Sequence, residues 1–166
     1  MMKKNKIVIA WDSNNISKIK EIIKKTEKIK LKFGYKFGLE FLNSKNGRNF
    51  ISKLNDKIIF ADLKLHDIPN TCVSTIKTMK DLKVNYLTIH ISSGLEALKA
   101  SKKIAGKTKL IGVTILTSLD NKSLKEIGFN SNVKKIVYQQ AKLANKAKLD
   151  AIVCSAQEVK LVKKVF

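Results

Sequence analysis

Short apolar runs rich in β-branched residues alternate along this chain with helical patterns, and this alternation constrains the fold more than any other feature. The runs predict six strands, at 6–11, 29–33, 57–65, 86–91, 109–116 and 151–154. Between the first two, Ile16, Ile19 and Ile23 form one apolar stripe of a helix that Ser13 or Asn14 could cap. Apolar strands that alternate with helices are typical of a parallel sheet buried on both faces. The sequence therefore predicts six βα units in a single domain, residues 1–166.

Reactive polar side chains end or follow several of these predicted strands. They are Asp12, Lys32, Asp62, Lys64, Asp67, His90, Thr117 and Ser118. A (β/α)₈ barrel builds its active site at the carboxyl ends of successive strands, whereas a doubly wound sheet binds at one switch point, usually with a Gly-rich phosphate turn. Because no such turn follows Asp12, we expect an α/β fold of the (β/α)₈ TIM-barrel family, with about six βα units of an incomplete barrel.

The charge of the chain is strongly positive, with 34 Lys and Arg against 13 Asp and Glu and a formal net charge of +21. Arg48 is the only arginine, and the lysines are spread along the whole chain, so we expect a solvated surface and no specific nucleic-acid partner. Such a field still favours weak polyanion binding, and a non-catalytic, basic polyanion-binding remnant stays open as an alternative.

The apolar runs also limit where the protein works. None approaches the roughly 18 residues that a membrane span requires, and no signal-peptide pattern is present at the start. Cys72 and Cys154 are too few and too far apart for a disulfide framework or a metal pattern, and they are expected to be small core residues. The sequence predicts a cytoplasmic protein with no membrane partner.

The segment Asp62–Thr71 is rich in ionisable and polar side chains of the types that take part in catalysis. Positions i and i+2 of a strand share a face, so Asp62 and Lys64 are expected to project together. With Lys32 and Asp67 they would form an alternating set of charges, which is how a partly dry cavity tolerates ionised groups. For Asp-x-Lys alone, a surface cluster of ion pairs is the competing interpretation.

The full string Asp62-Leu63-Lys64-Leu65-His66-Asp67-Ile68-Pro69-Asn70-Thr71 resembles the signature of the orotidine 5'-phosphate decarboxylase family. Four further segments are similar to that family in the same order, and the similarity runs from residue 6 to residue 166. They are Ile9-Ala10-Trp11-Asp12, Leu31-Lys32-Phe33-Gly34, Val113-Thr114-Ile115-Leu116-Thr117-Ser118 and Val153-Cys154-Ser155-Ala156-Gln157-Glu158. The resemblance implies a TIM barrel, a carboxy-lyase, and cofactor-free decarboxylation of orotidine 5'-phosphate to UMP and CO₂ in pyrimidine biosynthesis.

The resemblance also implies catalytic roles. Lys64 is expected to donate the proton to ring carbon C6, and Asp62 to lie beside the departing carboxylate. Lys32 and Asp67 are expected to complete the charge network, with no metal ligand and no cofactor.

For substrate binding, the resemblance implies that Asp12 and Lys32 contact the ribose and that Thr117 and Ser118 contact a pyrimidine edge. Thr71, together with Asp67, is expected to act across the interface of a homodimer.

The chemistry fits this assignment, because loss of CO₂ leaves a carbanion in the ring plane that no π-system delocalises. A fixed ammonium would stabilise that charge more in the transition state than in the ground state. A Mg²⁺-dependent sugar-phosphate decarboxylase of the same superfamily is a further alternative. Its acidic metal ligand would stand where Lys32 is, and a cation there would repel the metal.

Some positions depart from the family pattern. The 166 residues contain neither the Thr-Pro-Gly-Ile-Arg loop nor the Gly-Arg pair that strands seven and eight bring to the phosphate, so we expect a C-terminally truncated chain with little activity. Asn55, Lys83 and Lys148 stand where relatives often have glycine, which predicts left-handed backbone and marginal stability.

The remaining candidates are expected to be structural. His66 is predicted to be a loop residue, and His90 to line the barrel without a catalytic role. Trp11 is expected to pack into the helical layer.

Overall fold

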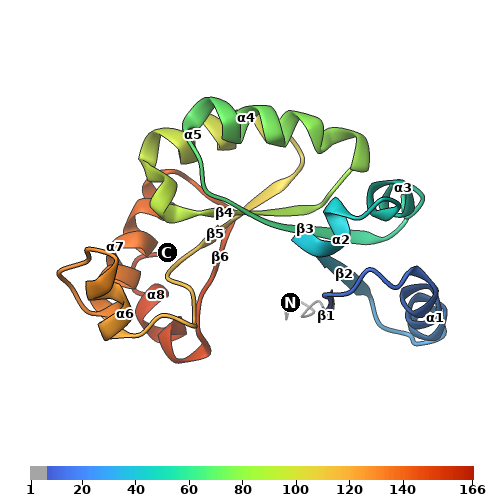
Figure 1. Cartoon of the computed structure of the whole chain (residues 1–166), viewed down its shortest axis with the longest axis horizontal. Helices are drawn as coiled ribbons and strands as arrows, with labels where there is room; N and C mark the ends of the chain where they lie inside the picture. Colours follow the sequence, from blue (N-terminus) through green and yellow to red (C-terminus); the bar gives the residue numbers. More distant parts are fainter. Residues whose placement is uncertain (1–6) are drawn as a thin grey trace. The chain divides into compact units, whose positions relative to one another are not determined.

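The computed structural model describes residues 7–166, which form six strands and eight α-helices (Figure 1). The strands are β1 (Ile7–Trp11), β2 (Phe33–Gly38), β3 (Ile58–Leu65), β4 (Tyr86–His90), β5 (Lys109–Val113) and β6 (Ala151–Val153). The helices are α1 (Ile16–Glu27), α2 (Leu39–Asn43), α3 (Gly47–Ser52), α4 (Pro69–Thr78), α5 (Gly94–Ile104), α6 (Asn121–Glu126), α7 (Val133–Lys146) and α8 (Val159–Val162). Three 3₁₀ turns complete the set, η1 (Lys80–Leu82), η2 (Ile91–Ser93) and η3 (Ala156–Glu158).

The strands follow one another in a single sheet in the order β1-β2-β3-β4-β5-β6. The pairs β1–β2, β2–β3 and β5–β6 are parallel. Helices connect successive strands, which is the arrangement of consecutive βα units in a (β/α)₈ barrel. None of the helices within residues 7–166 is long and apolar enough to cross a membrane.

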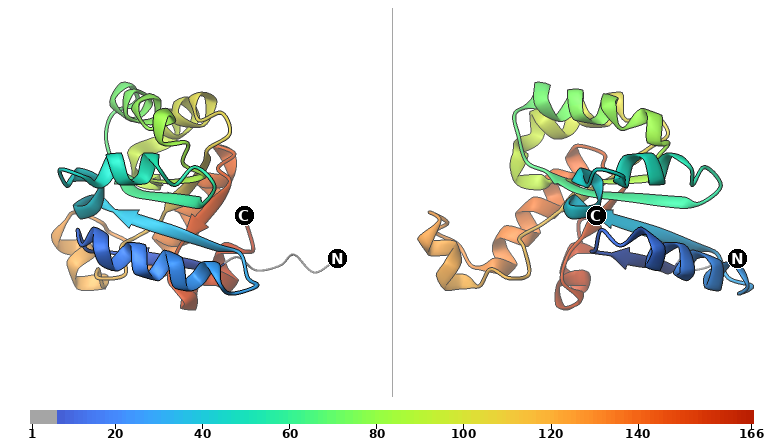
Figure 2. Two further views of the ribbon diagram at one scale, coloured as in Figure 1. Left: turned by 90° about the vertical axis from the view of Figure 1, so that its right-hand side faces the viewer. Right: turned by 45° about the vertical axis from the view of Figure 1, so that its right-hand side comes forward.

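The chain divides into two compact units. Unit 1 comprises the described residues up to Leu63 together with Met79–Leu87, and unit 2 comprises Lys64–Thr78 together with Thr88–Phe166. In unit 2, α4 and α5 lie side by side (Figure 2). That residues 1–166 act as one domain stays a prediction.

In unit 1, aromatic side chains fill the space between β2 and the two short helices that follow it. The ring of Phe37 lies 4.7 Å from that of Phe41 on α2, and both rings approach Phe50 on α3. Trp11 is buried and is the register partner of Phe37. It therefore lies on the face of the sheet that the helices cover, as predicted.

In unit 2, α7 and α8 share a buried cluster of Val137, Ala141 and Val162. The buried residues of α7 recur at helical spacing, as expected of a helix with one apolar face. Asn132 caps the helix, because its side chain accepts a hydrogen bond from the Lys135 N–H at 2.9 Å.

Two boundaries differ from the sequence prediction. Helix α1 begins at Ile16, but its cap is Asn15, whose side chain accepts from the Lys18 N–H at 3.0 Å. The predicted strand at 29–33 is wrong, since β2 spans Phe33–Gly38 and a turn occupies the preceding residues. Ile29 and Leu31 are exposed there, whereas the alternating Tyr35 and Phe37 are buried. The two-residue alternation, and not the apolar run before it, therefore marks this strand.

Two of the three positions where relatives often have glycine adopt left-handed backbone. Lys83 has φ 47° at the end of η1, and Lys148 has φ 57° after α7. The prediction is confirmed for both lysines. It is wrong for Asn55, which is absent from the residues with positive φ.

Replacing Lys83 or Lys148 with glycine should stabilise the protein, because glycine takes this conformation without the penalty of about 1 kcal/mol that a Cβ brings. We expect each substitution to raise the Tm by roughly 2–4 °C in a thermal melt followed by circular dichroism. The matched control is Asn55→Gly, which should leave the Tm unchanged or lower it. An equal rise in Tm for all three substitutions would contradict the conclusion that only the two lysines have left-handed backbone.

Candidate active site

In unit 1, polar residues lie near the carboxyl ends of β1 and β2 and on the neighbouring part of β3. Gly38 is the register partner of Asp62, and Asp12 directly follows β1. A Cβ built on Gly38 would lie 3.0 Å from Asp12 Oδ1, so the carboxylate of Asp12 lies against the bare backbone of Gly38. The structure therefore brings Asp12 and the last residue of β2 together, in register with Asp62.

The strongest polar contact of this group joins Lys36 of β2 to Asp62 of β3. Lys36 Nζ donates to Asp62 Oδ2 at 2.7 Å. The side chain of Asp62 is 8% exposed and that of Lys36 is 24% exposed, so water screens the pair only partly. A charge-assisted hydrogen bond at this distance fixes both side chains and keeps the buried carboxylate compensated.

Lys36, and not Lys32, is the lysine of this network. Lys32 was expected to end the second strand, but it lies exposed just before the first residue of β2. The tripeptide Lys-Phe-Gly occurs twice, at 32–34 and at 36–38, and the prediction of Lys32 rests on the first copy. The alternation of Tyr35 and Phe37 with Lys36 is the signal that could have found the second.

In unit 2, Lys64 departs from regular strand geometry. Its φ is 48°, in the left-handed region, although it lies within β3. Its N–H donates to Thr88 Oγ1 at 2.8 Å. The two-residue alternation that predicted a shared face for Asp62 and Lys64 assumes extended backbone at both positions, and Lys64 does not have it. Strand alternation therefore does not set the direction of the Lys64 side chain.

Asp67 lies in the turn between β3 and α4. Its Oδ1 accepts from the Ile68 N–H at 2.7 Å, and its carbonyl oxygen accepts from the Cys72 thiol at 3.3 Å. Cys72 is fully buried, as predicted, and burial raises the pKa of its thiol. Thr71 lies exposed in the first turn of α4, on the same segment as the exposed Asp67.

Two histidines lie close together in unit 2. The rings of His66 and His90 are 5.0 Å apart, and Ser92 Oγ is 3.2 Å from His66 Nε2. They line a cavity of about 260 Å³ with residues that follow β5 and with Gln140 of α7. His66 is an exposed residue just beyond β3, as expected of a loop position.

Thr117 and Ser118 lie exposed in a turn beyond the carboxyl end of β5, as predicted. The Leu119 N–H donates to the Leu116 carbonyl at 2.9 Å and closes this turn. Asp120 then caps α6, accepting from the N–H of Ser123 at 2.8 Å. This hydrogen bond holds the pKa of Asp120 below its ordinary value.

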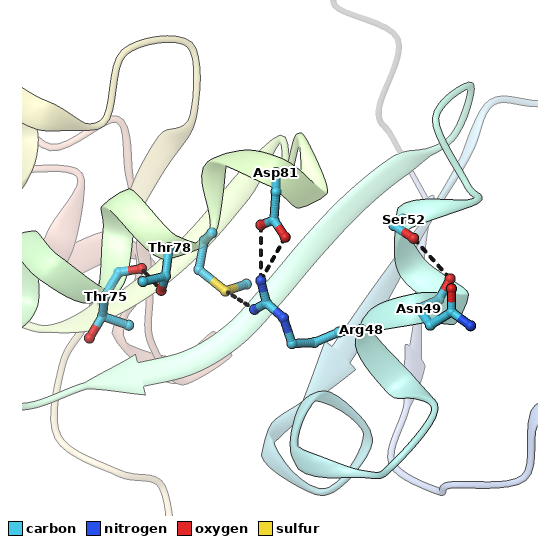
Figure 3. A network of polar contacts seen from close by, with 7 residues as sticks. Arg48, Asn49, Ser52, Thr75, Thr78 and Asp81 are labelled. Atoms are coloured by element: carbon cyan, nitrogen blue, oxygen red, sulfur yellow. Dashed lines mark hydrogen bonds and ion pairs between the residues drawn. The ribbon is translucent and has the colours of Figure 1, made fainter.

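Arg48, the only arginine of the sequence, is engaged in a contact within unit 1. Its Nη2 donates to both carboxylate oxygens of Asp81 at 2.9 Å, and Nη1 lies 3.4 Å from Met79 Sδ (Figure 3). The guanidinium therefore ties α3 to the η1 turn. Within residues 7–166, no group of three or more His, Cys, Asp or Glu side chains could hold a metal ion.

The order of the strands and the charged residues at their ends define a protein of the (β/α)₈-barrel class with an ionic site. The crystal structure of orotidine 5'-phosphate decarboxylase from Lactobacillus acidophilus matches with a TM-score of 0.84 and 32% identity, over 95% of this chain and 75% of that one. The predicted fold class is confirmed.

The family model of the orotidine 5'-phosphate decarboxylase / HUMPS family matches residues 5–166, and the chain belongs to this family. Orotidine 5'-phosphate decarboxylase from Wolbachia sp. subsp. Brugia malayi is 42% identical over 95% of this chain and 71% of its own length. The enzyme of the same name from Sphingopyxis alaskensis is 45% identical over 80% of this chain and 60% of its own length. The prediction of a carboxy-lyase of this family is confirmed.

Replacing Lys36 with methionine should destabilise the fold by about 1–3 kcal/mol, because the buried Asp62 carboxylate loses a charge-assisted hydrogen bond. Urea denaturation measures this loss as a lower midpoint. The matched control is Lys32→Met, which removes an exposed lysine four residues away and should change the midpoint very little. A larger effect at Lys32 than at Lys36 would restore the original assignment.

Proposed function

We propose that this chain decarboxylates orotidine 5'-phosphate, with the low activity expected from its sequence, through Asp62, Lys64 and Asp67, with Lys36 in the role that the resemblance assigned to Lys32. The observation that carries the proposal is the 2.7 Å contact between Lys36 of β2 and Asp62 of the adjacent strand β3. Lys64 follows two residues later on β3, and Asp67 follows in the next turn. The family membership of the chain supports the substrate and the cofactor-free reaction.

In this proposal, Asp62 and Lys64 act at different steps of the reaction. Asp62 is paired with Lys36 and faces the carboxylate that leaves as CO₂. Lys64 places its ammonium against the developing carbanion at C6 and then donates a proton to it, which leaves UMP and a neutral amine. Such a fixed charge acts most strongly where the charge develops, in the transition state.

The binding roles are proposed in the same way. Asp12 is proposed to accept hydrogen bonds from the ribose, and its position against Gly38 supports a fixed carboxylate there. Thr117 and Ser118 are proposed to contact the pyrimidine edge from the turn beyond β5. The Lys36 ammonium already compensates Asp62, and this favours the nucleotide reaction over a Mg²⁺-dependent one.

Replacing Lys64 with methionine should reduce turnover of orotidine 5'-phosphate by a factor of about 10²–10³ or more, the effect of removing one group that stabilises a developing charge. The loss of absorbance of the substrate measures this. The control Lys77→Met removes an exposed lysine of α4 and should keep the parent rate. A parent chain that neither turns over substrate nor gains Tm with the analogue 6-aza-UMP would refute the proposed function.

We further propose a homodimer in which Asp67 and Thr71 contact the partner's substrate. The supporting observation is Ile68, a large apolar side chain that is 66% exposed between these two residues. Asp67 and Thr71 are themselves exposed on the same segment. A dimer interface at this segment would remove the apolar surface of Ile68 from water, which is favourable. A cytoplasmic location also stays a prediction.

Replacing Ile68 with aspartate should shift the protein from dimer to monomer, because a charged side chain cannot be buried unpaired in an interface. Sedimentation velocity of the parent and the variant measures the change. The exposed Ile127 of unit 2 gives the matched control, Ile127→Asp, which should leave the mass unchanged. A parent that sediments as a monomer at high concentration would contradict the dimer.

A further inference from the structure

Lys64 has left-handed backbone, with φ 48°, although it lies inside a β-strand. Lys83 and Lys148 also have positive φ, but they follow a 3₁₀ turn and a helix, where left-handed residues commonly end an element. Lys64 lies inside β3, where extended backbone is the rule. A residue with a Cβ keeps such a conformation only where its surroundings hold it.

A buried hydroxyl on the next strand holds Lys64. The Lys64 N–H donates to Thr88 Oγ1 at 2.8 Å, and Thr88 is only 1% exposed on β4. In a parallel sheet, strand N–H groups ordinarily donate to carbonyl oxygens of a neighbouring strand, and here a side-chain oxygen accepts instead. Because threonine is β-branched, its χ1 is restricted and the acceptor has a defined position.

Hydroxyl groups also contact the next two residues. Ser93 Oγ lies at hydrogen-bond distance, 3.5 Å, from the Leu65 carbonyl oxygen, and Ser92 Oγ lies 3.2 Å from His66 Nε2. Thr88, Ser92 and Ser93, which we call the hydroxyl clamp, come from β4 and the η2 turn. They contact three successive residues at the end of β3. Of the three, only the Thr88 contact is both short and buried.

We propose that Thr88 is a positioning residue for the reaction: its hydroxyl keeps Lys64 left-handed and thereby directs the Lys64 ammonium. A rotation of φ toward extended backbone would move the Lys64 Cβ, and with it the whole side chain, to a different direction. A displacement of a reacting group by about 1 Å can cost a factor of about 10² in rate. This inference rests on the proposed role of Lys64, and it adds a residue that never touches the substrate.

The test compares Thr88→Val with Thr88→Ser. Valine has the shape of threonine but offers no acceptor, whereas serine keeps the hydroxyl. In Thr88→Val, we expect the NMR signal of the Lys64 amide to shift and its hydrogen exchange to accelerate at least tenfold. We expect kcat to fall by a factor of about 10–100 with little change in KM, because ground-state binding does not depend on Lys64. Thr88→Ser should restore the amide signal and most of kcat.

A second pair of variants separates positioning from general loss of stability. Cys72→Ala removes a buried side chain of unit 2 that contacts the Asp67 carbonyl, and it should lower the Tm without shifting the Lys64 amide signal. Lys64→Gly takes positive φ freely, so in its background Thr88→Val should lower the Tm less than it does in the parent.

The outcomes are distinguishable. An unchanged Lys64 amide signal and an unchanged kcat in Thr88→Val would overturn the proposal, as would a Thr88→Ser variant as defective as Thr88→Val. A parent without turnover or 6-aza-UMP binding defeats the proposed function instead. The amide signal and its exchange rate then still decide whether Thr88 holds Lys64.

Discussion

A carboxylate buried within β3 needs a cation, and the contact between Asp62 and Lys36 supplies it. The two residues come from adjacent parallel strands, so the pair forms only when β2 and β3 align as they do. An ionised carboxylate without this partner would cost far more than a surface ion pair gains. The same alignment sets Gly38 beside Asp62 and leaves room for the carboxylate of Asp12. The register between β2 and β3 therefore determines which charged side chains meet in the site.

Residues 64–67 are held by hydrogen bonds that involve side chains. Lys64 and the residues after it are held by side-chain oxygens, of which Thr88 is the most buried, while the Cys72 thiol fixes the carbonyl of Asp67. Strained backbone that is held by its surroundings is common at functional sites, because a reactive side chain must point where regular structure would not send it. The residue with the strained backbone, Lys64, is also the one proposed to protonate the carbanion that loss of CO₂ leaves.

The sequence predicted some parts of this structure well and others poorly. Helix α7 and the six βα units follow from apolar periodicity, which reports burial directly. The left-handed backbone of Lys83 and Lys148 was predicted from the family pattern, in which glycine often stands at these positions. The position of β2 was missed because Ile29 and Leu31 form an apolar run that remains exposed, while the strand itself alternates aromatic residues with glycine and Lys36. Both candidates carry the tripeptide Lys-Phe-Gly, and only the two-residue alternation of buried aromatic residues with Lys36 distinguishes the second.

The sequence by itself determined the class of fold, the family and the charged string from Asp62 to Asp67, because strand period, helix period and residue identity are properties of the chain alone. Only the tertiary structure decided which lysine pairs with Asp62, since that depends on the register between two strands. It also decided that Lys64 is left-handed and that Thr88 accepts its N–H. These contacts join residues 24 and 26 positions apart, and no local pattern encodes them.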